Sequence, residues 1–241
     1  MTSHAPRQAA QYAPEFERRV DEVKASKSDL NALVMNYLIN EGYQAAAENF
    51  AKEANMSPQV NWEEMNERVK IRHLIFAGDI RNAIIGINNL DQAILDSDKS
   101  LHFSLLRLQL IELIKECCAS PSGDVQPAIT FAATELAPRA TSSELFLEDL
   151  ERTMALLCFP HDSLVPELQE LLDPALRRSV ANRVNEKILE AQGLSKETKI
   201  RSLVKLRAWG EDRLRQQHKD LPKLELGIDF ITPVEQDQMM T

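Results

Sequence analysis

Few residues of this sequence have the types and spacing that catalysis requires. The run His161-Asp162-Ser163 contains the residue types of a nucleophilic triad, but consecutive side chains diverge and cannot form the hydrogen-bonded relay. The run fits a turn after Phe159-Pro160 better. No glycine-rich phosphate loop, HExxH or GxSxG motif occurs. We therefore predict that the chain is not an enzyme, with no catalytic residues.

The cysteines and histidines do not have metal-ligand spacing either. Of three cysteines, Cys117 and Cys118 are adjacent and Cys158 stands alone, so no CxxC pair exists for zinc. Adjacent helical residues point about 100° apart, which suits packing better than joint coordination of one ion. We expect buried or half-buried cysteines, a packed or surface His73, no metal site, and no bound cofactor.

Composition favours an all-α protein. The 241 residues are 44% hydrophobic with only 7 glycines, enough apolar material for a core and few turn residues. The net charge of −9 argues against nucleic acid and anionic membranes as partners. The stretch from Lys196 to Lys219 is mildly basic but contains acidic residues, so we read it as a solvated helix face. Without a membrane span or leader we expect cytoplasm and nucleus.

Helical periodicity is clearest near the N-terminus. Apolar residues recur at helical spacing on one stripe: Leu30, Leu33, Val34, Tyr37 and Leu38. Ser28 suits an N-cap, and Gly42 suits a helix end because it tolerates the left-handed conformation. A second short helix carries Ala46, Ala47, Phe50 and Ala54. The two form a helical hairpin.

About nine helices are expected in all. Asn61 and Thr141 each precede a glutamate by three positions, Asp173 precedes a proline, and Asp79 can cap the helix that follows it. The segment from Leu101 to Cys118 is apolar on more than one face, so it must be central to the core or covered by a partner. A helix from about Asp124 to Leu136 is expected to stop at Pro138.

The hairpin resembles a LisH motif. Its segment reads LNALVMNYLINEGYQAAAENFAKE, with Tyr37-Leu38, Gly42-Tyr43, Ala46 and Phe50 at matching positions. Two helices this short cannot bury their apolar face alone, so pairing with a second copy is a natural remedy. The resemblance implies a dimerisation motif.

The remainder resembles the CTLH and CRA segments that follow LisH motifs. The CTLH likeness rests on Arg68, Ile71, Ile75, Gly78-Asp79-Ile80 and Ala83-Ile84, and the CRA likeness on LLRLQLIELI, AITFAATELAP, MALLCF and LLDPALRRSVANRVNEKIL. The domains then run as follows: N-terminal tail 1–25, LisH 26–58, CTLH 59–117, CRA 103–221 with overlap on the last CTLH helix, and C-terminal tail 222–241.

The resemblance implies a small non-catalytic scaffold subunit of the GID/CTLH ubiquitin ligase, without RING, SPRY or propeller domains. Such a subunit would bridge a SPRY-type scaffold partner and RING-bearing subunits, and would self-associate or form an obligate hetero-oligomer. The alternative is a LisH-containing adaptor of cytoskeletal or microtubule-associated complexes, which need not contain CRA-like residues. The expected interface residues are Leu30, Leu33, Val34, Tyr37, Leu38, Tyr43, Phe50, Ile75, Ile80, Ile84, Phe103, Leu106 and Leu110.

Overall fold

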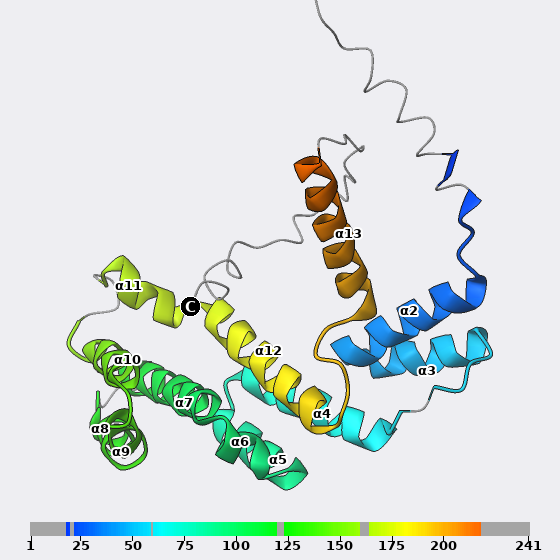
Figure 1. Ribbon diagram of the computed structural model, residues 1–241. Coiled ribbons are helices and arrows are strands. Elements are labelled where there is room, and N and C mark those ends of the chain that lie inside the picture. The colour runs from blue at the N-terminus through cyan, green and yellow to red at the C-terminus, as the bar shows by residue number, and fades with distance from the viewer. Residues whose placement is uncertain (1–17, 20–21, 59, 120–122, 160–163, 218–241) are drawn as a thin grey trace, which may run out of the picture. The chain divides into compact units, whose positions relative to one another are not determined.

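The computed structural model describes residues 18–19, 22–58, 60–119, 123–159 and 164–217 (Figure 1). The run 161–163 and most of the two predicted tails lie outside these residues. The described chain divides into two units. One runs from Val34 to Thr198, and the other combines the residues up to Leu33 with those from Lys199 onward.

Every regular element in the described part of the chain is helical, which confirms the predicted all-α fold. The elements are α2 (Lys27–Glu41), α3 (Gln44–Glu53), α4 (Trp62–Ala77), α5 (Ile80–Leu90), α6 (Ala93–Ser97), α7 (Lys99–Ala119), α8 (Gln126–Phe131), the π-helical η1 (Ala132–Leu136), α9 (Ala137–Ala140), α10 (Glu144–Ala155), α11 (Pro166–Gln169), the 3-10 turn η3 (Glu170–Leu172), α12 (Pro174–Ala191) and α13 (Lys199–Gln216). No helix among the described residues is long and apolar enough to cross a membrane.

Helix α7 is the centre of the larger unit, as its apolar sequence predicted. Leu101, Leu105 and Leu108 pack with the inner faces of α4, α5 and α12. Phe103 and Leu110 belong to a second cluster, formed with residues from α8 to η3. A helix in contact with neighbours on both sides needs apolar residues all round, and the chain supplies these neighbours itself.

The hairpin α2–α3 has a small apolar cluster of its own. Met35 and Ile39 on α2 meet Ala47 and Ala51 on α3, and all four are buried. The sharp turn between the helices passes through Gly42 at φ +82°, a conformation that L side chains seldom adopt.

Three of the five predicted N-caps are confirmed. The side chain of Asn61 accepts hydrogen bonds from the backbone of Glu63 and Glu64, Asp79 accepts from Asn82, and Asp173 accepts from Ala175. Each satisfies amide groups that the first turn of a helix leaves without partners. These caps fix where α4, α5 and α12 begin.

The fourth cap, Thr141, is wrong. Helix α10 begins after Ser143, and the Thr141 hydroxyl donates to the carbonyl of Pro138. The predicted stop at Pro138 is also wrong, because the π-helical turn η1 precedes it and places Pro138 in the first turn of α9. A first-turn residue has no intrahelical amide bond to lose.

Two further local predictions need correction. Ser28 lies inside α2, and it is the Ser26 hydroxyl that accepts from the Asp29 amide, 3.1 Å away. Cys117 is buried as expected, but Cys118 and Cys158 are exposed. His73 is a surface residue.

Candidate protein-interaction surface

The outer face of α2 is apolar and uncovered in this chain. Leu30 is 51% exposed, Val34 40% and Tyr37 39%. Their spacing of four and three residues places them on one side of the helix, while Met35 and Ile39 fill the inner side. Soluble proteins seldom leave a contiguous apolar face in water unless a partner covers it.

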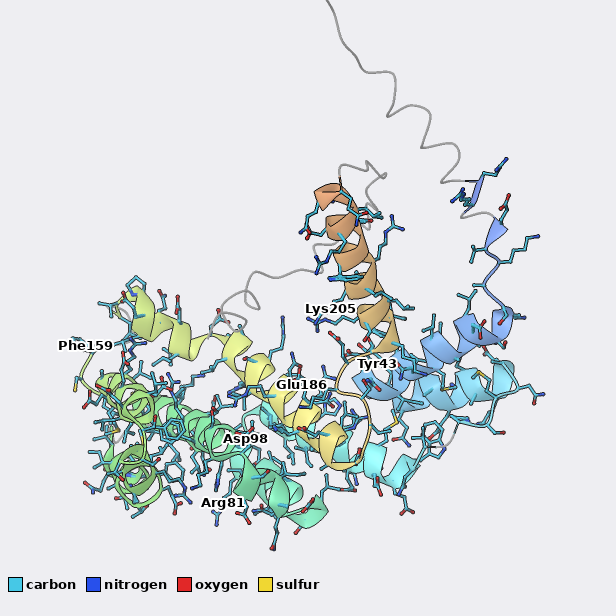
Figure 2. The ribbon with its side chains drawn as sticks, viewed as in Figure 1. Tyr43, Arg81, Asp98, Phe159, Glu186 and Lys205 are labelled. Atoms are coloured by element: carbon cyan, nitrogen blue, oxygen red, sulfur yellow. The ribbon has the colours of Figure 1, made fainter. Side chains whose placement is uncertain are left out.

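Tyrosines extend this face to the turn of the hairpin. Tyr43, labelled in Figure 2, follows Gly42 and is 52% exposed. Its ring centroid lies 6.2 Å from that of Tyr37. Partial burial, followed by the charge of Glu41, raises the pKa of the Tyr37 phenol. The phenol therefore remains a neutral donor and acceptor at the edge of the apolar face.

The other hairpin residues predicted for an interface are only partly available. Leu33, Leu38 and Phe50 are half-buried, and both Leu38 and Phe50 pack against the hairpin cluster. The apolar stripe predicted from the sequence thus has a half-buried part and an exposed part. We name Leu30, Val34, Tyr37 and Tyr43 the outer hairpin face.

A polar joint connects the end of α2 to the rest of the larger unit. The guanidinium of Arg68 on α4 donates to the carbonyls of Ile39, 2.6 Å away, and Asn40, 3.0 Å away, and to Oδ1 of Asn185 on α12, 2.6 Å away. Arg72 donates to the carbonyl of Glu41 at 2.8 Å. The last three carbonyls of α2 are thus all bonded to α4.

Asn40 adds a further connection at the same place. It is 5% exposed, and its side-chain amide donates to the carbonyl of Ser195, 3.0 Å away, in the segment after α12. Four parts of the larger unit therefore meet here: the end of α2, α4, α12 and the segment that follows α12. We call Asn40, Arg68, Arg72 and Asn185 the polar joint.

Burial changes the electrostatics of this joint. Arg68 is 2% exposed, and desolvation, followed by the charge of Arg72, lowers its pKa while Glu41 acts in the opposite direction. No described carboxylate forms an ion pair with Arg68. Its charge is balanced by the negative end of α2, whose carbonyls accept its hydrogen bonds.

Helix α13 belongs to the smaller unit and has no buried residue. Ile200 is 37% exposed, Leu203 50% and Leu206 60%, and they follow one another at intervals of three. Trp209 is 60% exposed, with the Arg213 guanidinium 5.6 Å from its ring centroid. At intervals of three, these four side chains are spread over about half of the helix circumference, so α13 exposes apolar residues without forming one narrow stripe. The stretch predicted to be a solvated helix face is thus exposed, but it also carries large apolar side chains.

The remaining predicted interface residues lie inside the fold. Ile84 is half-buried and packs against both main clusters. The others are fully covered by the chain itself: Ile75, Ile80, Phe103, Leu106 and Leu110. Their side chains need no partner to be buried.

Other exposed apolar residues of the larger unit were missed. Phe76 at the end of α4, Ile85 on α5 and Leu145 on α10 are 37%, 49% and 71% exposed. A groove of about 530 Å³ between α5, α7 and α8 is lined by polar and apolar residues, among them Arg81 and Phe131. Ile85 and Leu145 lie away from the buried residues of their own helices, so the periodicity of the buried faces does not identify them.

The described residues contain no cluster of His, Cys, Asp and Glu suited to a metal ion.

Comparison with known proteins identifies the two domains. Residues 28–54 match the LisH family. Residues 64–215 match the family described as the CTLH/CRA C-terminal to LisH motif domain. The hairpin and its outer face thus lie in the first match, and α5 to α12 lie in the second.

Several curated proteins match most of the chain. It is 38% identical to the Protein GID8 homolog of Arabidopsis thaliana over 84% of this chain and 81% of that protein. It is 38% identical to GID complex subunit 8 of Schizosaccharomyces pombe over 88% of this chain and 89% of that protein. It is 39% identical to the Glucose-induced degradation protein 8 homolog of Dictyostelium discoideum over 83% of this chain and 85% of that protein.

Proposed function

This chain belongs to the family of LisH proteins with a C-terminal CTLH/CRA domain, and we propose that it is a non-catalytic scaffold subunit of a GID ubiquitin ligase complex. In this role it binds a SPRY-type scaffold partner and RING-bearing subunits, and so connects substrate recognition to ubiquitin transfer. Cytoplasm and nucleus are its proposed compartments.

The relatives support membership of such a complex. The Schizosaccharomyces pombe protein is named as a GID complex subunit, and it matches 88% of this chain at 38% identity. The CTLH/CRA match over residues 64–215 favours this reading over a cytoskeletal LisH adaptor, which has no need of that domain.

The observation that carries the proposal is the outer hairpin face. Leu30, Val34 and Tyr37 are each at least 39% exposed although the hairpin already has a closed inner cluster. Full burial of such side chains contributes roughly 1.5–3 kcal/mol each before the costs of association. A matching apolar helix on a partner would therefore bind here.

Affinity capture of the tagged chain from its own cells tests the proposal. The captured proteins are expected to include a SPRY-type LisH protein and RING-bearing subunits. Replacing Leu30 and Val34 together by Asp should abolish capture of the hairpin-bound partner. Unpaired charge in a desolvated contact costs several kcal/mol, which lowers affinity on the order of a hundredfold or more.

The matched control replaces Leu145 and Leu147 on α10 by Asp. They are 71% and 45% exposed, so the control also places two carboxylates at exposed positions of one helix, and capture should stay as for the wild type. Circular dichroism should show unchanged helical content in both variants. Capture of cytoskeletal proteins in place of RING-bearing subunits would refute the proposal.

A further inference from the structure

The polar joint contains a buried charge that the fold does not need for packing. Arg68 is 2% exposed, and its Nε has no hydrogen-bond partner. Burial of an ion without an ionic partner is costly. Arg68 therefore needs an explanation other than stability.

The geometry of its hydrogen bonds supplies an explanation. The two terminal nitrogens reach two consecutive carbonyls of α2 and the Asn185 side chain of α12, at 2.6 to 3.0 Å. A guanidinium is a rigid planar fork, so it fixes the direction of its acceptors as well as their distance. Bonded in this way, α2 can take only one orientation against α4 and α12.

Apolar packing alone does not fix that orientation. The cluster of the hairpin shares no residue with the clusters around α7. Val60 and Trp62, just before and at the start of α4, pack against it, but burial of apolar area is not directional. Close contact at Gly42 adds a steric limit, because a Cβ there would lie 2.9 Å from Cγ2 of Val69 on α4. The direction of the hairpin depends on the hydrogen bonds of the joint.

We propose that Arg68 is a positioning residue that holds the LisH hairpin at one angle to the CTLH–CRA helices. A partner bound to the outer hairpin face is then presented to the rest of the assembly in one direction. This last consequence rests on the proposed function, whereas the fixed angle does not. Because Arg68 is 2% exposed, it acts on such a partner through the hairpin.

Distances between two spin labels measure the angle directly. In a chain whose three native cysteines are replaced, Lys52→Cys on α3 and Glu186→Cys on α12 provide exposed labelling positions on either side of the joint; Figure 2 labels Glu186. Labelled chains are diluted with unlabelled chain, so that only pairs within one chain contribute. The unmodified joint should give one narrow distance distribution.

Arg68→Met should broaden that distribution or add a second distance. Arg68→Lys keeps the charge but lacks the planar fork, and it should broaden the distribution as well. Asn185→Ala removes only the bond to α12 and should have a smaller effect in the same direction. The matched control is Arg178→Met, at an exposed arginine of α12, which should leave the distances unchanged.

A second label pair separates hinge motion from general loosening. Glu116→Cys on α7 and Glu186→Cys on α12 both lie on the CTLH–CRA side of the joint. This pair should stay narrow in every variant. The proposal is wrong if folded Arg68→Met and Arg68→Lys keep the original narrow distribution across the joint, or if both label pairs broaden together. Narrow distances in a chain that captures no ligase subunits would refute only the proposed function.

Discussion

Arg177 on α12 forms a two-point hydrogen bond with the carboxylate of Glu112 on α7. Its Nε lies 2.9 Å from Oε1, and its Nη2 contacts Oε2. The third nitrogen, Nη1, donates to the carbonyl of Phe76 at the end of α4, 3.0 Å away. One side chain thus joins three helices of the larger unit, as Arg68 does from the middle of α4.

Replacing Arg177 should destabilise the fold. Arg177→Met leaves the Glu112 carboxylate, whose side chain is 14% exposed, with only the weaker contact to Lys115 at 3.4 Å. Loss of a hydrogen bond to a charged group that is mostly buried costs about 1–3 kcal/mol. Urea unfolding should show a lower free energy of unfolding by this amount. Arg178→Met, at the exposed neighbouring arginine, should stay within about 0.5 kcal/mol.

The same pair makes Gly78 sensitive to substitution. Gly78 has φ +88°, and an added Cβ would lie 2.8 Å from Nη2 of Arg177. Gly78→Ala therefore combines backbone strain of about 1–2 kcal/mol with displacement of a guanidinium held by Glu112. Thermal melts should show a larger loss than for Gly193→Ala, where φ is +68° and no atom lies within 4 Å.

A double substitution tests this coupling. In an Arg177→Met background the excess cost of Gly78→Ala over Gly193→Ala should largely disappear, because residues that share a contact are not additive. An unchanged excess in that background would show that the clash is not with Arg177.

Local signals in the sequence were read correctly where the structure is decided locally. Asn61 and Asp173 cap their helices because a short polar side chain next to the first turn suffices. Thr141 failed because a cap depends on where the preceding helix ends, and the π-helical turn η1 extends that helix to Ala140. Such a turn has no strong signature in the sequence.

Contacts between distant residues explain what sequence reading missed. Arg68 reaches Ile39 and Asn185, 29 and 117 positions away, and nothing in the sequence around Arg68 indicates that it is buried. Likewise, Phe103 and Leu30 are both apolar residues on helical stripes, yet they are 1% and 51% exposed. Periodicity identifies an apolar face but not whether the chain itself covers it.

Acidification should weaken the fold through His102 on α7. Desolvation, followed by the charge of Arg139, lowers the pKa of His102 in the folded chain, so folding favours the neutral imidazole. Its contribution to stability is complete above the unfolded value of about 6.5 and is lost as the pH falls through the lower folded value. The free energy of unfolding should therefore decrease below about pH 6.5.

Replacement of this histidine isolates its contribution. His102→Gln cannot be protonated, so the fall in the free energy of unfolding between neutral and acidic pH should become smaller. His73→Gln, a change at an exposed histidine of α4, is the control. An equal pH dependence in the wild type and His102→Gln would contradict the assignment.

Shortening a side chain on either side of α2 should have different effects on stability. Leu38 packs against the hairpin cluster, so Leu38→Ala removes buried methyl groups and should destabilise the isolated chain by about 1–3 kcal/mol, below the 2–5 kcal/mol of fully buried sites. Leu30 is 51% exposed, so Leu30→Ala should change the free energy of unfolding by less than about 0.5 kcal/mol.

Partner binding should show the opposite order. Leu30→Ala removes apolar area from the outer hairpin face and should weaken a purified LisH partner's affinity about tenfold, since each 1.4 kcal/mol of lost contact is a factor of ten. Leu38→Ala should weaken it less once measured below its unfolding transition, because most of its contacts are inside the hairpin. If Leu30→Ala binds as the wild type does and Leu38→Ala does not, the partner approaches the hairpin from the side that Leu38 faces, and the outer hairpin face is wrongly assigned.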